Sequence, residues 1–190
     1  MKLLTGTLLA ATLSTAAFAT QAEVMVLEEA SFEDSNYYLL TSSSWDDAQA
    51  KAIELGGNLI TINSFEENSF IRDLWLTGGT SSFATDFLWL GLTDRDEEGV
   101  FSWVSGETFD YENFRPGEPN NAGSGENYVQ MIGSGKWNDI GNDPESRIVF
   151  GVVEINFGDS NLSDVPTPLL GIGMLGLLGL AAGRSRKANA

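Results

Sequence analysis

The fold class is decided by the stretch Leu88-Trp89-Leu90-Gly91-Leu92, a short and almost wholly apolar run. Runs of this length, bounded by turn-forming residues, are typical of buried strands. Similar runs follow at 100–104, 128–132 and 148–155, separated by stretches rich in Gly, Asn and Asp. We therefore expect short antiparallel strands in the C-terminal half of the chain.

Two helices are expected before these strands. Ser44-Trp45-Asp46-Asp47 resembles a capping box that opens the first helix, and Gly56-Gly57 ends it. Ser64-Phe65-Glu66-Glu67 has the same pattern and opens the second helix. Short strands are expected at 37–40 and 58–62. Two helices followed by antiparallel strands predict an α+β fold in which the helices are segregated from the sheet.

The charge of the chain limits its partners. Its 190 residues include 27 acidic and 10 basic ones, which gives a net charge of −17. A field of this sign repels phosphate backbones, so nucleic acid is not an expected partner. Cations, or neutral ligands bridged by cations, are better candidates. The alternative explanation is that the acidity only keeps a secreted protein soluble.

The chain has no cysteine and no histidine. This excludes Cys–His and Ser–His catalysis, zinc sites with His or thiolate ligands, and a disulfide framework. The metal ligands that remain are carboxylate and amide oxygens, which suit calcium. For an enzyme, the only ready mechanism is a pair of carboxylates that act on a glycoside.

Residues 1–22 are predicted to be a signal peptide. Met1-Lys2 begins a short basic stretch, an apolar run follows at 3–18, and Ala17-Phe18-Ala19 fits a small-x-small cleavage site. The run is too short and too weakly flanked for a membrane span. We expect export by the general secretory route.

The segment 165–190 has the composition of a sorting signal. A polar linker at 157–164 leads to Val165-Pro166-Thr167-Pro168, an apolar run at 169–182 and a basic tail. This order resembles the PEP-CTERM signal of Gram-negative bacteria, with Val-Pro-Thr-Pro in place of Val-Pro-Glu-Pro. The resemblance implies processing by an exosortase-type enzyme, transient inner-membrane contact through 169–182, and a mature protein in the cell envelope or outside the cell. A plain C-terminal membrane anchor is the alternative.

A long stretch with little regular pattern, 105–127, carries the residues that suggest a binding site. Together with the following Trp137-Asn138-Asp139, it supplies three carboxylates and two amides as candidate calcium ligands: Glu118, Asn120, Glu126, Asn138 and Asp139. Open calcium positions could accept sugar hydroxyls, while the amide nitrogens donate hydrogen bonds. The alternative interpretation is that these residues are ordinary loop formers.

Four motifs in order along the chain resemble the C-type lectin domain, over residues 35–156. They are Leu55-Gly56-Gly57-x-Leu59, Leu88-Trp89-Leu90-Gly91-Leu92, Pro116-Gly117-Glu118-Pro119-Asn120 and Trp137-Asn138-Asp139. Glu126 lies 8 residues after Glu118 and 12 before Asn138, which is the spacing of calcium ligands in that family. The resemblance implies two helices packed on short antiparallel sheets, with a long calcium-binding loop.

The resemblance also implies roles for individual residues. The five candidate ligands would hold a principal calcium ion, and four of them would also touch sugar: Glu118, Asn120, Glu126 and Asn138. The Glu-Pro-Asn triplet implies mannose-type glycans, whose neighbouring hydroxyls are both equatorial. A second calcium ion would be held by Asp94, Glu98 and Asn121. The family's usual disulfides fall at positions that here hold Ala52 with Val153, and Tyr128 with a residue near Asn142.

The expected function is calcium-dependent carbohydrate binding by an exported bacterial protein, with a glycan or exopolysaccharide as partner. The alternative is a protein of the same fold that binds no sugar and acts as an adhesin, matrix component or ice-binding protein. No enzyme is expected, because every acid with a recognisable spacing is already assigned to a metal.

Overall fold

The computed structural model describes residues 23–123, 125–142 and 148–156. The predicted signal peptide, linker and sorting signal lie outside these ranges. Along the chain the elements are β1 (Val26–Phe32), β2 (Ser35–Ser42), α1 (Trp45–Glu54), β3 (Asn58–Leu59), α2 (Phe65–Trp75), β4 (Phe87–Thr93), β5 (Ser102–Trp103), β6 (Tyr128–Ile132), β7 (Trp137–Ile140) and β8 (Phe150–Asn156). Within the described ranges, no helix is long and apolar enough to cross a membrane.

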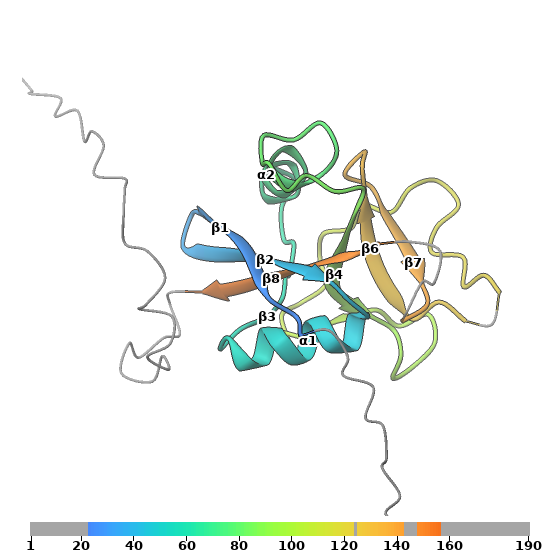
Figure 1. Cartoon of the computed structure of the whole chain (residues 1–190). Helices are drawn as coiled ribbons and strands as arrows, with labels where there is room; N and C mark the ends of the chain where they lie inside the picture. Colours follow the sequence, from blue (N-terminus) through green and yellow to red (C-terminus); the bar gives the residue numbers. More distant parts are fainter. Residues whose placement is uncertain (1–22, 124, 143–147, 157–190) are drawn as a thin grey trace, which may run out of the picture.

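The strands form one sheet in the order β1-β2-β8-β4-β6-β7, with β3 paired to β8 and β5 to β4 (Figure 1). The last strand, β8, therefore lies between β2 and β4, beside the N-terminal β1–β2 pair. The β4–β8 pair is parallel, with Leu88 opposite Phe150, and the other pairs are antiparallel. The α+β class is confirmed, and the parallel pair refines the expected antiparallel arrangement.

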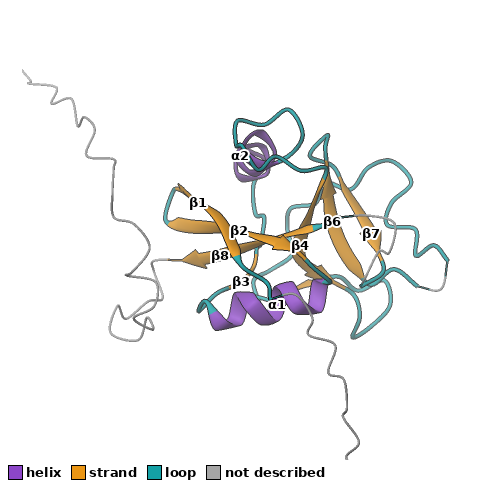
Figure 2. Cartoon of the chain, in the orientation of Figure 1, coloured by secondary structure: helices purple, strands orange, loops and turns teal. Residues whose placement is uncertain are grey.

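Both helices begin where the capping boxes predict. The side chain of Ser44 accepts a hydrogen bond from the backbone N–H of Asp47, and Ser64 does the same for Glu67, each at 3.1 Å. These bonds satisfy backbone donors that the first turn of a helix leaves free. The two helices lie on opposite sides of the sheet (Figure 2).

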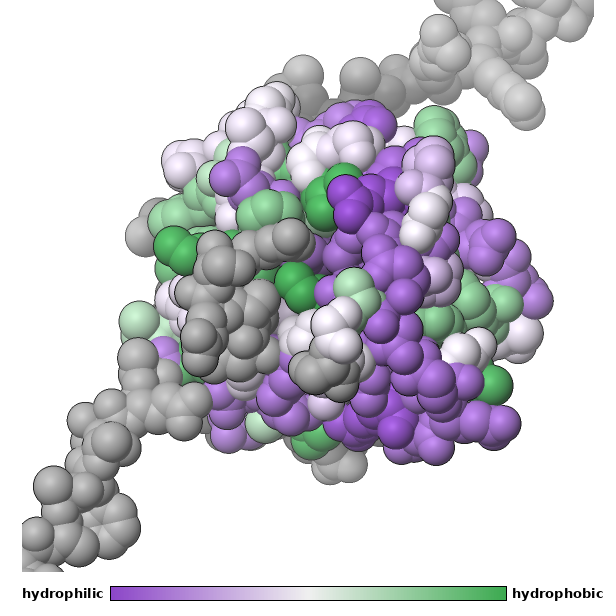
Figure 3. Space-filling model, turned by 90° about the vertical axis from the view of Figure 1, so that its right-hand side faces the viewer, coloured by the Kyte–Doolittle hydropathy of each residue, from purple (hydrophilic) through white to green (hydrophobic). Residues whose placement is uncertain are grey.

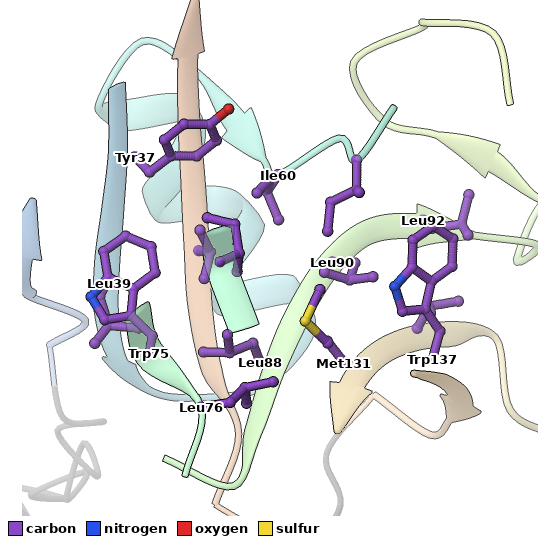
Figure 4. Packing of buried hydrophobic residues seen from close by; sticks show 14 of the residues in the cluster. Tyr37, Leu39, Ile60, Trp75, Leu76, Leu88, Leu90, Leu92, Met131 and Trp137 are labelled. Atoms are coloured by element: carbon purple, nitrogen blue, oxygen red, sulfur yellow. The ribbon is translucent and has the colours of Figure 1, made fainter. Parts of the chain in front are cut away.

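The alternation of side chains along the strands divides the core into two layers. In β4, Leu88, Leu90 and Leu92 join a cluster on the α2 side, whereas Trp89 joins a second cluster on the α1 side. Figure 4 shows the first cluster, in which the leucines of β4 lie near Met131 and Trp137. The domain is therefore held by packing on both faces of one sheet.

The positions that the resemblance assigns to disulfides are filled by apolar contacts. Ala52 of α1 and Val153 of β8 are both fully buried in the cluster on the α1 side. Tyr128 packs against Trp45 with the two rings tilted by 41° and their centroids 4.8 Å apart. Burial of this kind replaces part of the stability that a disulfide would supply.

Two strands were not expected from the sequence. β1 precedes residue 35 and pairs with β2, so the sheet extends N-terminal to the expected domain boundary. β7 contains Trp137-Asn138-Asp139, which the sequence placed beside the long loop, and it pairs with β6 along its length. β3 is shorter than the expected strand at 58–62.

Candidate functional site

Strand β7 carries two of the predicted ligands and holds them rigidly. Trp137 is fully buried, and its indole N–H donates to Asn68 Oδ1 at 2.8 Å. Edge-to-face contacts with Trp103, Tyr111 and Phe114 fix the indole further. The next two residues, Asn138 and Asp139, are 6% and 1% exposed.

The carboxylate of Asp139 attaches the long loop to β7. Its oxygens accept the backbone N–H of Asn120 at 3.1 and 3.0 Å and that of Asn121 at 2.7 Å. Asn138 stays on its own strand, where its amide nitrogen donates to the backbone carbonyl of Asp139. This face of the molecule, on the β7 side of Figure 1, is dominated by hydrophilic residues (Figure 3).

Glu126 closes the loop on itself. The Oδ1 atom of Asn121 accepts the backbone N–H of Glu126 at 2.8 Å, and the Glu126 carboxylate accepts the backbone N–H of Ala122 at 2.8 Å. Asn121 adopts a φ of +47°, a left-handed conformation that Asn tolerates better than most residues. The structure thus connects Asn120, Glu126 and Asp139 through backbone hydrogen bonds.

Glu118 has a different partner, which the sequence analysis missed. Its Oε1 atom accepts hydrogen bonds from Arg115, one from Nε at 2.9 Å and one from Nη2. The Glu118 side chain is only 3% exposed, and its other oxygen, Oε2, is buried with no hydrogen-bond partner in the part of the chain that the structure describes. The Glu118–Pro119 peptide bond is cis. The three-residue spacing of Arg115 and Glu118 across a turn was the feature of the sequence that could have indicated this ion pair.

The residues predicted to hold a second calcium ion also come together. Asp94 is 3% exposed, and its Oδ2 accepts the backbone N–H of Gly99 at 2.9 Å. Its Oδ1 is buried and has no hydrogen-bond partner among the described residues. Desolvation and the negative charge of Asp94 raise the pKa of Glu98. The charge of Asp139 also raises this pKa, and a hydrogen bond with the Asn121 side chain lowers it. Asn121 and Asp139 therefore link the two predicted sites.

The side chains as they stand do not form a closed metal centre. In the part of the chain that the structure describes, no three acidic side chains lie close enough together to hold a metal ion. The donor set nevertheless fits a hard dication, because each predicted cluster keeps one buried carboxylate oxygen without a partner, Glu118 Oε2 and Asp94 Oδ1. Buried carboxylate oxygens are normally satisfied, so these two atoms suit an additional ligand.

Comparison with known proteins identifies the domain. The family model for the lectin C-type domain matches residues 41–149. This chain belongs to the C-type lectin domain family. Domains of this family bind carbohydrate and are not enzymes, which confirms the prediction of a binding protein rather than an enzyme. The match includes the long loop at 105–127.

Curated relatives match a similar length of the chain. The low affinity immunoglobulin epsilon Fc receptor of Mus musculus is 38% identical over 109 residues, which is 57% of this chain and 30% of the receptor. Ladderlectin of Oncorhynchus mykiss is 33% identical over 122 residues, 62% of this chain and 63% of that protein. The match thus spans less than a third of the receptor, so the similarity concerns one domain of it.

Solved structures share the fold. The C-type carbohydrate-recognition domain of cow CD23, determined in the presence of a GlcNAc2Man3 oligosaccharide, is 36% identical with a TM-score of 0.58 and covers 67% of this chain and 92% of that domain. The mouse scavenger receptor C-type lectin domain is 30% identical with a TM-score of 0.57 and covers 67% and 93%. Both cover the loop-bearing domain and confirm the fold.

Proposed function

We propose that the chain binds mannose-type glycans through a calcium ion held by Glu118, Asn120, Glu126, Asn138 and Asp139. The observation that carries this proposal is the Oε2 atom of Glu118, which is buried and has no hydrogen-bond partner among the described residues. A dication would supply that partner and draw the remaining carboxylates toward it. The oligosaccharide named with the cow CD23 structure supports glycan binding as the general activity.

In this proposal residues of the loop and of β7 contact the sugar directly. When bound, calcium supplies open coordination positions for two neighbouring sugar hydroxyls. Glu118 and Glu126 accept the protons of those hydroxyls, and the amide nitrogens of Asn120 and Asn138 donate to their oxygens. Asp139, almost fully buried, holds the loop in position through its hydrogen bonds to backbone N–H groups.

The second cation site is part of the same proposal. Asp94 and Glu98 would contribute carboxylates and Asn121 an amide oxygen, and the unpartnered Oδ1 of Asp94 is suited to this role. Because Asn121 also accepts the backbone N–H of Glu126, an ion here would stiffen the loop that carries the sugar-binding residues.

We propose in addition that the protein is exported, with residues 1–22 as signal peptide and 165–190 as a PEP-CTERM-like signal read by an exosortase-type enzyme. The supporting observation is the order of polar linker, Val165-Pro166-Thr167-Pro168, apolar run and basic tail. The glycan would then be an exopolysaccharide or a glycan of the envelope surface. Intact-mass measurement of the protein from its native host tests this, since loss of both ends is expected.

The proposed sugar specificity is tested on a glycan array, probed with the protein in calcium and in EDTA. Mannose-type glycans should bind only with calcium, and Glu118→Gln should abolish the signal. Glu54→Gln is the matched control, because Glu54 is an exposed residue of α1 that pairs with Lys51. Sugar binding retained in EDTA would contradict the proposal. Calcium binding with no array signal would favour a non-sugar adhesin, matrix or ice-binding protein of the same fold.

A further inference from the structure

A pocket of about 530 Å³ lies next to Glu118, between Lys136 and the segment 112–119. Its volume is in the range of sites that hold small molecules. Glu118 lines this pocket and is also a predicted calcium and sugar ligand. A glycan held at Glu118 would therefore have its neighbouring sugar residue at the pocket.

Lys136 gives the pocket a positively charged group that forms no salt bridge with the described residues. Among the basic residues that the structure describes, four have a carboxylate within 4.0 Å: Lys51, Arg72, Arg95 and Arg115. Lys136 has none in the same ranges, and its ammonium group donates to Asn113 Oδ1 at 2.6 Å. An ammonium carries three N–H donors, so two remain for a ligand.

Arg115 adds a second set of donors. It uses Nε and one Nη2 proton on Glu118 Oε1, and its side chain is 48% exposed. The guanidinium has five N–H donors, so the end formed by Nη1 and the other Nη2 proton stays available within the described part of the chain. That end has the geometry of a bidentate contact to a carboxylate, sulfate or phosphate group.

Phe114 supplies an apolar wall beside these charges. Its ring is half-buried and held by Phe101 and Trp137, with centroid distances of 5.5 and 5.7 Å. A fixed aromatic ring can pack against the C–H face of a sugar ring. Glu112 also lines the pocket, and its carboxylate would repel an anionic ligand. Replacing one charged residue therefore changes the net charge of the pocket.

We propose that this pocket is a second sugar subsite for a residue with an anionic substituent, adjacent to the mannose-type residue at Glu118 and Asn120. The inference rests on the proposed function and narrows its ligand to a glycan in which an anionic residue adjoins the mannose-type residue. Lys136 and the free end of Arg115 contact the anionic group, and Phe114 packs against the ring.

The test is calorimetric titration of the protein, in saturating calcium and low salt, with three disaccharides. Each has a terminal mannose, joined to glucose, to glucuronate or to glucose 6-sulfate. One of the two anionic ligands should bind about two- to fivefold more tightly than the neutral one, as expected for solvent-accessible ion pairs. The stronger of the two identifies carboxylate or sulfate as the preferred group.

Variants assign the preference to the pocket. Lys136→Gln should remove it without changing affinity for the mannose–glucose disaccharide or for calcium, and Glu112→Gln should increase it. Lys51→Gln, which changes a lysine on α1, is the matched control and should have no effect. Equal affinity of all three disaccharides, or a preference that survives Lys136→Gln, would overturn the subsite.

Two monosaccharides titrated alone, methyl glucuronide and methyl glucoside 6-sulfate, separate this inference from the proposed function. If the mannose–glucose disaccharide does not bind but methyl glucuronide shifts the NMR signals of Lys136 and Asn113, the pocket stands and the mannose site fails. If mannose binds through calcium and no anionic ligand shifts those signals, the subsite fails and the proposed function stands.

Discussion

At the scale of single residues, Asp139 connects the two predicted cation sites. Its carboxylate accepts the backbone N–H groups of Asn120 and Asn121, and its charge also acts on Glu98. Because the side chain is 1% exposed, water competes little for these charge-assisted bonds. One side chain on β7 therefore positions the loop that carries the other candidate ligands.

Asp139→Asn removes this charge while keeping the shape of the side chain. We expect calcium affinity to fall by about 10- to 100-fold, as for loss of a group that orients metal ligands. Calcium titration by calorimetry measures the change, with Asp73→Asn as control, since Asp73 is exposed and pairs with Arg72. Calcium affinity equal to that of the wild type would show that Asp139 has no part in the site.

At the scale of elements, α1 and β8 approach closely because β8 has a glycine at their contact. A Cβ atom at Gly151 would lie 2.9 Å from Ala48 Cβ and 3.1 Å from Leu40 Cδ1. Real Cβ atoms almost never approach another atom so closely, so a larger residue would push the helix from the sheet. The small residue is required by packing, since no positive φ is involved.

Gly151→Ala should therefore destabilise the domain by about 1–3 kcal/mol, the usual effect of overpacking. Urea denaturation followed by tryptophan fluorescence measures the free energy of unfolding. Gly133→Ala is the control, because a Cβ atom there meets nothing within 4 Å. If the two variants unfold alike, the close approach of α1 to β8 is not a determinant of stability.

The elements that the sequence predicted well are those fixed by local chemistry. The caps at Ser44 and Ser64 depend on residues three positions away, so the pattern alone identifies them. β1 and β7 depend on pairing with other strands, and β7 is short and polar at Asn138 and Asp139, so no local pattern revealed it. In the site, the spacing marked the candidate ligands, but not that Arg115 holds Glu118.

At the scale of the whole molecule, the domain buries two acidic groups away from the candidate calcium loop. Burial is the main cause that raises the pKa of Glu154 to about 7, and the charges of Glu67 and Glu107 act in the same direction. Its carboxylate accepts the backbone N–H of Thr61 at 3.1 Å, which lowers the pKa only in part. Glu67 is also buried, with its pKa raised mainly by desolvation, and accepts the hydroxyl of Tyr37 at 2.7 Å.

This buried pair makes stability depend on pH. A raised carboxyl pKa means that the protonated form favours the folded state, so the contribution of Glu154 is complete below pH 4.5 and is lost as the pH rises through about 7. The free energy of unfolding should therefore fall by on the order of 2–3 kcal/mol between pH 5 and 8 through Glu154, and Glu154→Gln should abolish this fall. Denaturation in EDTA at each pH measures it, with the exposed Glu54→Gln as control. An unchanged pH profile in Glu154→Gln would contradict the assignment.

Calcium should also stabilise the whole domain, since the candidate ligands converge only in the folded chain. An ion that binds the native state alone at 100 times its Kd adds about 2.7 kcal/mol. For a domain of this size we expect Tm to rise by roughly 5–10 °C in calcium, and EDTA should reverse the shift. Magnesium at the same concentration is the control, because it prefers a small octahedral site. Equal Tm values in calcium and EDTA would argue against the native-state site.

The central claim is that the loop anchored on Asp139 binds sugar through calcium. Calorimetric titration of the protein with methyl α-mannoside, in saturating calcium and in excess EDTA, tests it most directly. We expect one saturable site in calcium, which disappears in EDTA and which in Asp139→Asn requires about 10- to 100-fold more calcium. Equal mannoside binding in calcium and in EDTA would contradict it.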